Sequence, residues 1–98
     1  MKIEWRPLAE ADLTEIVRYI APHNLKAAYD LHLKITDHVA ILADHPKIGR
    51  PGRVEDTREL VVFRTRYIVA YRIVGNGVTI LRVLHGARRW PNSFSETY

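Results

Sequence analysis

Residues 67–85 restrict the possible folds of this chain more than any other part of the sequence. Two apolar runs, "YIVAYRI" and "VTILRVLH", flank the turn signal "GNG". Each run has the length of one strand, and glycine and asparagine accept the positive φ of a tight hairpin. The runs do not alternate strictly, since Ile68, Val69 and Ala70 are consecutive and all apolar. A hairpin that is apolar on both faces has to be covered on both.

Two amphipathic helices precede the hairpin and are expected to cover one face of it. Apolar residues recur at helical spacing behind Pro7, a residue that the first turn of a helix tolerates well: Leu13, Ile16, Val17 and Ile20. The segment "APHN" ends this helix, and Asn24 is a suitable cap for a second helix from Leu25 to about Ala43. The two predict a helical hairpin, which leaves the other sheet face for a partner chain or a second copy.

The remaining segments complete an α+β domain of order β-α-α-β-β-β. A short extended segment, "MKIEW", comes first, and "RELVVF" (58–63) supplies the third strand before the hairpin. Residues 44–57 contain two prolines and two glycines and read as a long loop. We therefore predict a helical hairpin packed on one face of a small twisted antiparallel sheet. We expect residues 1–98 to form a single domain, of which about 92–98 are a flexible tail.

Several classes of protein are excluded by what the sequence lacks. It has no cysteine, so it has neither a disulfide framework nor a cysteine metal site. His32, His38 and His45 are not spaced as a helical metal pair requires, and we expect no metal and no cofactor. No stretch is long and apolar enough for a membrane span, and the N-terminus does not read as a signal peptide. A cytoplasmic protein is expected.

The positive charge is concentrated in the second half of the chain. Residues 1–49 carry six Lys or Arg against seven Asp or Glu, a net charge of −1. Residues 50–98 carry nine arginines, no lysine and four acidic residues, a net charge of +5. Arginine's planar fork recognises phosphates and carboxylates better than an ammonium does. The expected partner is acidic, either a nucleic acid or a protein with an acidic tail.

Three segments together resemble the RelE/ParE superfamily of type II toxin–antitoxin toxins. "PLAEADLTEIVRYIA" is similar to the first helix of that family, and "LADHPKIGRPGR" to its loop after the second helix. "VVFRTRYIVAYRIVGNGVTILRVLHGARRW" is similar to its C-terminal sheet, and "RVLHGAR" resembles the ParE side of the superfamily. The resemblance implies the helical hairpin and sheet described above. It also implies a cognate antitoxin that covers the sheet face and edges.

The ParE-like resemblance implies a toxin that inhibits DNA gyrase by protein binding, without chemistry of its own. Such a toxin needs a recognition surface, and arginine and tryptophan are common anchors of interfaces. The residues expected to bind the target lie in the turn before the hairpin, at its end and just after it: Arg64, Arg66, Arg82, His85, Arg88, Arg89 and Trp90.

A RelE-like, ribosome-dependent mRNA endoribonuclease is the alternative. His85 would be an acid or base, and Arg64, Arg82 and Arg88 would hold phosphate. A carboxylate base could come from the region that holds Glu55, Asp56 and Glu59. The second half has no lysine, and Trp90 stands where that branch has a tyrosine. These departures favour the ParE-like reading, although whether the chain is an enzyme stays open.

Each candidate residue also has a structural interpretation. His85 could simply bond a carbonyl at the end of its strand, and Arg82 could pair with Glu59 across the sheet. Asp12 and Glu15 share the expected solvated side of the first helix. The segment from Arg88 to Trp90 could be a tail that packs on the helices.

Overall fold

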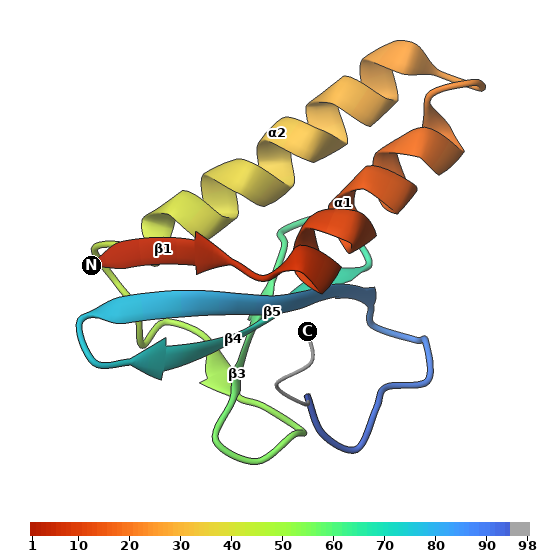
Figure 1. The fold of residues 1–98 in the computed structure, drawn as a ribbon. Helices are drawn as coiled ribbons and strands as arrows, with labels where there is room; N and C mark the ends of the chain where they lie inside the picture. The colour runs from red at the N-terminus through yellow and green to blue at the C-terminus, as the bar shows by residue number, and fades with distance from the viewer. Residues whose placement is uncertain (95–98) are drawn as a thin grey trace.

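Residues 1–94, the part of the chain that the computed structural model describes, form a helical hairpin lying across one face of a five-stranded sheet (Figure 1). The predicted order of elements and the α+β class are confirmed. The elements are β1 (Lys2–Trp5), α1 (Pro7–Ile20), α2 (Leu25–Ile41), β2 (Arg50–Pro51), β3 (Arg58–Val61), β4 (Tyr67–Val74) and β5 (Gly77–His85).

The sheet is mixed, with strand order β1-β5-β4-β3-β2. β1 runs parallel to β5, from the pair Lys2–Gly77 to the pair Trp5–Ile80, and the other neighbours are antiparallel. The prediction of a wholly antiparallel sheet is therefore wrong for β1, and β2 was not predicted. Both strands are too short for a local sequence pattern to predict their pairing, because tertiary contacts determine it.

Local signals account well for the boundaries of the helices and of the hairpin. α1 begins at Pro7, and the Asn24 side chain caps α2 by accepting the Ala27 N–H at 2.9 Å. Gly75 lies at φ +56° in the turn between β4 and β5, as the "GNG" signal requires. These predictions are confirmed.

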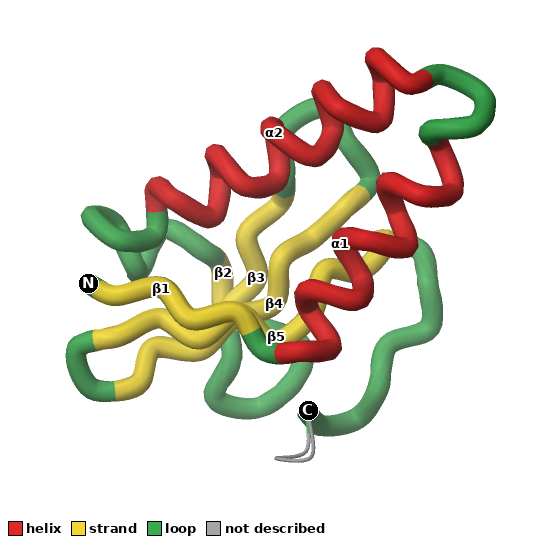
Figure 2. Tube along the Cα trace, turned by 45° about the horizontal axis from the view of Figure 1, so that its top comes forward, coloured by secondary structure: helices red, strands yellow, loops and turns green. Residues whose placement is uncertain are grey.

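The main core lies between the helices and the sheet (Figure 2). Buried apolar side chains of α1 and α2 meet alternate residues of the two central strands: Ala9, Ile35, Val39, Val69, Tyr71, Val78, Ile80 and Val83. Ile80 and Val83 are three residues apart, which a regular strand would place on opposite faces. A bulge explains this, because Tyr71 pairs with Ile80 and Ala70 with Arg82, leaving Leu81 as the extra residue.

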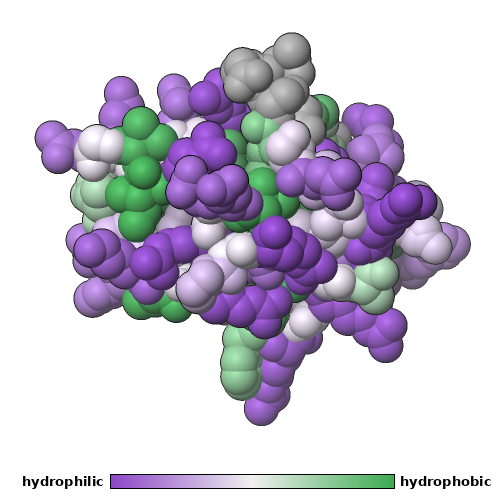
Figure 3. All heavy atoms as spheres, turned by 90° about the horizontal axis from the view of Figure 1, so that it is seen from below, coloured by the Kyte–Doolittle hydropathy of each residue, from purple (hydrophilic) through white to green (hydrophobic). Residues whose placement is uncertain are grey.

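The face of the sheet away from the helices is covered in its middle by this chain. After β5 the chain loops out and returns beneath the sheet (Figure 1). Phe94 and Val54 pack there with Ala70 and Leu81 in a second buried cluster, which Trp90 joins. From that side, hydrophilic side chains dominate the surface, with apolar atoms between them (Figure 3). The prediction that this face is left for a partner is wrong for its centre.

We call residues 88–94 the C-terminal strap. A flexible tail was expected from about residue 92, yet Phe94 is only 7% exposed. The strap therefore packs on the sheet through an aromatic residue that sequence pattern alone assigned to the tail. Residues 95–98 of the expected tail lie outside the described residues.

Replacing Tyr71 by Phe is expected to reduce the free energy of unfolding by about 1–3 kcal/mol, because the buried Gly49 N–H loses its acceptor. The Tyr71 hydroxyl accepts that N–H at 2.9 Å and donates to the Pro46 carbonyl at 2.7 Å. Burial raises the pKa of this hydroxyl, which keeps its proton for donation. Urea unfolding of both proteins gives the comparison, and a change below the error of the fit would contradict the role assigned to Tyr71.

Candidate functional site

One end of the sheet carries the arginines expected to bind a target. Tyr67 at the start of β4 pairs with His85 at the end of β5, so the residues before β4 and after β5 lie at the same end of the sheet. Four exposed arginines lie in these two segments and form no ion pair with another described residue: Arg64, Arg66, Arg88 and Arg89. We call this set the arginine rim.

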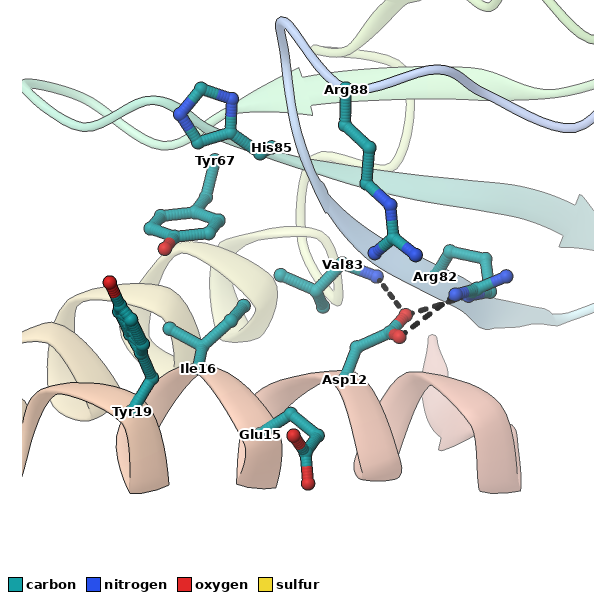
Figure 4. Close-up of a pocket in the computed structure, with 9 residues that line it drawn as sticks. All are labelled: Asp12, Glu15, Ile16, Tyr19, Tyr67, Arg82, Val83, His85 and Arg88. Atoms are coloured by element: carbon teal, nitrogen blue, oxygen red, sulfur yellow. Dashed lines mark hydrogen bonds and ion pairs between the residues drawn. The ribbon is translucent and has the colours of Figure 1, made fainter.

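A cleft of about 410 Å³ opens beside the rim, between α1 and the end of β5 (Figure 4). Its α1 wall holds Asp12, Glu15, Ile16 and Tyr19, which share one helical face. Its sheet wall holds Tyr67, Arg82, Val83, His85 and Arg88. The Arg88 guanidinium points into the cleft, whereas the Glu15 carboxylate points away from the arginines (Figure 4). We call this space the α1–β5 cleft.

Asp12 and Arg82 form an ion pair at the base of the α1–β5 cleft. The Arg82 Nε and Nη2 donate to the Asp12 carboxylate at 2.7 and 2.9 Å, and the Val83 N–H donates to it at 2.9 Å. The side chains are only 12% and 15% exposed for Asp12 and Arg82. Because β1 pairs with β5 only as far as Ile80, a carboxylate of α1 takes the place of a strand neighbour at Val83.

This ion pair corrects two predictions. Arg82 does not pair with Glu59, and Asp12 is not merely solvated on the outer side of α1. Arg82 directly follows the bulge at Leu81, and the sequence does not reveal where a bulge interrupts the alternation of a strand.

His85 organises the turn that follows β5. Its Nδ1 accepts the Ala87 N–H at 3.1 Å, so the proton of the neutral ring is on Nε2. Its carbonyl accepts the Arg88 N–H at 3.0 Å and the Trp90 indole N–H at 3.2 Å. The ring meets Tyr67 edge-on, with the centroids 5.7 Å apart. His85 thus holds the start of the strap as well as lining the cleft.

Glu59 on β3 has both carboxylate oxygens hydrogen-bonded. It is 3% exposed and lies between two guanidiniums, accepting from Arg50 Nη2 at 3.0 Å and from Arg53 Nε at 3.0 Å. The backbone N–H of Arg53 donates to it at 2.8 Å. Burial acts to raise the pKa of Glu59, but these hydrogen bonds outweigh it and hold the pKa below its ordinary value. Such a carboxylate is a weak base.

Replacing Glu59 by Gln should destabilise the domain most clearly near neutral pH. The pKa of Glu59 is lower in the folded protein, so its contribution to stability is present above the ordinary value of 4.5. That contribution is lost as the pH falls through the lower pKa of the folded state. Melting temperatures of the parent and Glu59→Gln, measured from pH 7 to pH 3, should therefore converge in acid. A difference that stays constant over this range would contradict the assignment.

The seven expected target-binding residues thus occupy three different environments. Arg82, His85 and Arg88 line the α1–β5 cleft, while Arg64, Arg66 and Arg89 are exposed on the rim. Trp90 lies under Arg53, whose Cζ is 3.8 Å from the ring centroid, on the sheet face away from the helices. The interpretation of residues 88–90 as a tail packed on the helices is therefore wrong for Trp90, whereas the Arg88 side chain lines the cleft beside α1.

Sequence reasoning missed other residues around the α1–β5 cleft and the strap. Tyr19 and Tyr67 line the cleft from opposite walls, and Arg53 contacts Trp90. The spacing of Asp12, Glu15 and Tyr19 places them on one side of α1 and was the available signal for that wall. Nothing in the sequence brings Arg53 to Trp90, since 37 positions of chain separate them.

Residues 1–94 offer neither a cluster of metal ligands nor a helix of membrane-spanning type. No group of three His, Asp or Glu side chains is placed to hold a metal ion there. No helix in the same range is long and apolar enough to cross a membrane.

The fold is shared with a solved structure from a bacterial toxin–antitoxin system. A solved structure titled "Chromosomal ParDE TA system from P. aeruginosa" superposes with a TM-score of 0.79 and 26% sequence identity. The match covers 87% of this chain and 95% of that one. The architecture therefore places the chain among toxins of the RelE/ParE superfamily.

Sequence comparison gives the family within that superfamily. The family profile described as the ParE toxin of the type II toxin–antitoxin system parDE matches residues 3–90. The chain belongs to this ParE toxin family. Y4kP of Sinorhizobium fredii, whose name assigns it to the toxins, is 41% identical over 90 residues, 92% of this chain and 93% of Y4kP. Toxin RelE2 of Caulobacter vibrioides is 34% identical over 87 residues, 89% of this chain and 97% of RelE2.

Proposed function

We propose that this ParE-family toxin inhibits DNA gyrase in the cytoplasm by binding it through the arginine rim, and that a cognate antitoxin neutralises it. Membership of the ParE toxin family supports this proposal most strongly. The rim supports it independently, because its exposed arginines form no ion pair with another residue of the described range 1–94 and can therefore contact a partner.

Several polar side chains that a catalytic mechanism would use already form hydrogen bonds within the protein, which favours binding without catalysis. The Arg82 guanidinium is engaged by Asp12, so it is not poised for a phosphate. Glu59 already accepts from two arginines, and its lowered pKa makes it a poor base. His85 uses Nδ1 to hold the following turn, which leaves only Nε2 for proton transfer. General acid–base catalysis needs a second proton-transferring group beside His85, and neither Arg82 nor Glu59 supplies one.

The antitoxin has apolar surface to cover outside the centre of the sheet face. Leu25, Tyr29 and Leu33 recur every four residues along α2 and are 75%, 61% and 39% exposed. Val61, the last residue of β3, and Phe63, two residues after it, are 45% and 62% exposed. Exposed apolar side chains gathered on one element favour a protein partner. They also predict self-association of the isolated toxin.

The RelE-like alternative has one geometric observation in its favour. The α1–β5 cleft brings His85, Arg88 and the phenols of Tyr19 and Tyr67 around a single space. Two relatives with RelE in their names, Toxin RelE2 and Toxin RelE3 of Caulobacter vibrioides, are each 34% identical to this chain. In this reading His85 Nε2 would transfer a proton and Arg88 would hold a phosphate.

Expression of the chain without an antitoxin separates the two proposals. A gyrase inhibitor should induce the DNA-damage response and leave translated messages intact. His85→Asn is the matched variant, because the Asn carbonyl can accept the Ala87 N–H in place of Nδ1 but cannot act as an acid or base. His85→Asn should remain toxic. Loss of toxicity in a folded His85→Asn, together with codon-phased cleavage of messages, would instead establish the nuclease.

A further inference from the structure

The C-terminal strap forms no strand, and two of its aromatic side chains pack on the sheet. Phe94 packs in the second cluster with Val54, Ala70 and Leu81. Trp90 donates its indole N–H to the His85 carbonyl and lies beneath the Arg53 guanidinium. These aromatic contacts join the strap to the sheet, and Arg88 and Arg89 directly precede Trp90 in the chain.

Arg53 is itself held in place by a buried carboxylate. Glu59 accepts the Arg53 N–H at 2.8 Å and the Arg53 Nε at 3.0 Å, so both the backbone and the side chain of Arg53 are fixed relative to β3. A guanidinium whose donors are held by a carboxylate still offers its flat face to an aromatic ring. The distance of 3.8 Å from Arg53 Cζ to the Trp90 ring centroid shows this stacking.

We propose that Arg53, fixed by Glu59, is a clasp that holds Trp90 and thereby positions Arg88 and Arg89 for target binding. Arg53 and Glu59 are positioning residues in this scheme. Arg53 contacts Trp90 of the strap, and Glu59 contacts Arg53. Neither residue belongs to the arginine rim or lines the α1–β5 cleft. The part of the proposal that concerns the target rests on the proposed function, whereas the part that concerns the strap depends on the structure alone.

The chain contains a matched control for Arg53. Arg50 donates to the same carboxylate, with Nη2 3.0 Å from Glu59 Oε1, and is similarly exposed. Arg53 stacks on Trp90, and no such contact joins Arg50 to an aromatic ring within the described residues. Arg50→Ala and Arg53→Ala therefore each remove one ion pair of Glu59, but only Arg53→Ala removes the stacking on the strap.

Limited trypsin digestion followed by mass spectrometry reports on the strap directly. Trypsin cuts after Arg88 and Arg89 when the surrounding chain opens. Losing a partly exposed cation–π contact should raise cleavage at these two sites by about tenfold in Arg53→Ala. Cleavage in Arg50→Ala should stay within about twofold of the parent, because the stacking remains. Equal cleavage in the two variants would overturn the clasp.

Inhibition of DNA gyrase by the purified variants reports on positioning. We expect Arg53→Ala to inhibit about tenfold less strongly than the parent, and Arg50→Ala to match the parent. Faster cleavage of Arg53→Ala with unchanged inhibition would overturn the positioning role. A parent that does not inhibit gyrase would refute the proposed function and with it the target role, while the cleavage ratio would still test the clasp.

Melting temperatures show whether a substitution unfolds the domain, which would change both trypsin cleavage and gyrase inhibition. The melting temperatures of Arg50→Ala and Arg53→Ala should agree within about 5 °C. If Arg53→Ala melts lower, Arg53→Lys takes its place, because an ammonium keeps the ion pair with Glu59 but has no flat face for the indole. Arg53→Lys should then show the faster cleavage and weaker inhibition, and parent-like values for both would overturn the proposal.

Discussion

Asp12→Ala is expected to lower the free energy of unfolding by about 3 kcal/mol, the largest loss of stability that we expect from a single substitution outside the apolar core. The substitution takes the carboxylate away from the Arg82 guanidinium and from the Val83 N–H, both of which donate to it within 2.9 Å. Arg82 is only 15% exposed, so water compensates poorly for the missing charge. Chemical denaturation followed by circular dichroism measures the change.

Glu15→Ala is the control for Asp12→Ala. Glu15 lies on the same side of α1, but its side chain is 75% exposed and its ion pair with Arg18 is long, at 3.7 Å. Its removal should change stability by less than about 0.5 kcal/mol. Asp12→Asn should fall between the two, since an amide oxygen can still accept the Val83 N–H. If Asp12→Ala were no more destabilising than Glu15→Ala, the ion pair would not be what joins α1 to β5.

The double substitution Arg88→Ala and Arg89→Ala is expected to reduce toxicity at least thirtyfold. Truncating an arginine anchor of an interface typically costs about 2 kcal/mol in binding, which is roughly a thirtyfold loss. Both residues are exposed, and neither forms an ion pair with another described residue, so the melting temperature should change little. Growth inhibition titrated against expression level measures the loss.

Arg18→Ala controls for the loss of one positive charge. Arg18 is 73% exposed on α1 and lines neither the arginine rim nor the α1–β5 cleft, so its removal should leave toxicity unchanged. A double variant that stays fully toxic would remove Arg88 and Arg89 from the recognition surface. A double variant that has lost its fold would show that these arginines support the strap structurally.

The helices and the hairpin could be predicted because their signals are local. Pro7, Asn24 and Gly75 each act within one turn of chain, and the helical spacing of apolar residues is fixed by the geometry of a single helix. The pairing of β1 and the formation of β2 depend on contacts across the whole domain. No pattern within four residues determines whether a strand joins its neighbour parallel or antiparallel.

The sequence indicated which residues belong to the candidate site, but it did not indicate which side chains they contact. The concentration of arginines at the end of the chain pointed to Arg88 and Arg89, which are exposed. The partners of Arg82 and Trp90 could not be predicted, because a bulge and a returning strap bring Asp12 and Arg53 to them. The apolar pattern correctly required a cover for the second sheet face, but the cover is the chain's own Phe94 and Trp90.

Supercoiling of relaxed plasmid by purified DNA gyrase, titrated with this toxin, tests the central claim most directly. We expect inhibition by the parent and by His85→Asn, and at least roughly thirtyfold weaker inhibition by the Arg88→Ala and Arg89→Ala double variant. The same protein, added to translating ribosomes, should leave the message uncut. Unimpaired supercoiling together with message cleavage that His85→Asn abolishes would contradict the account.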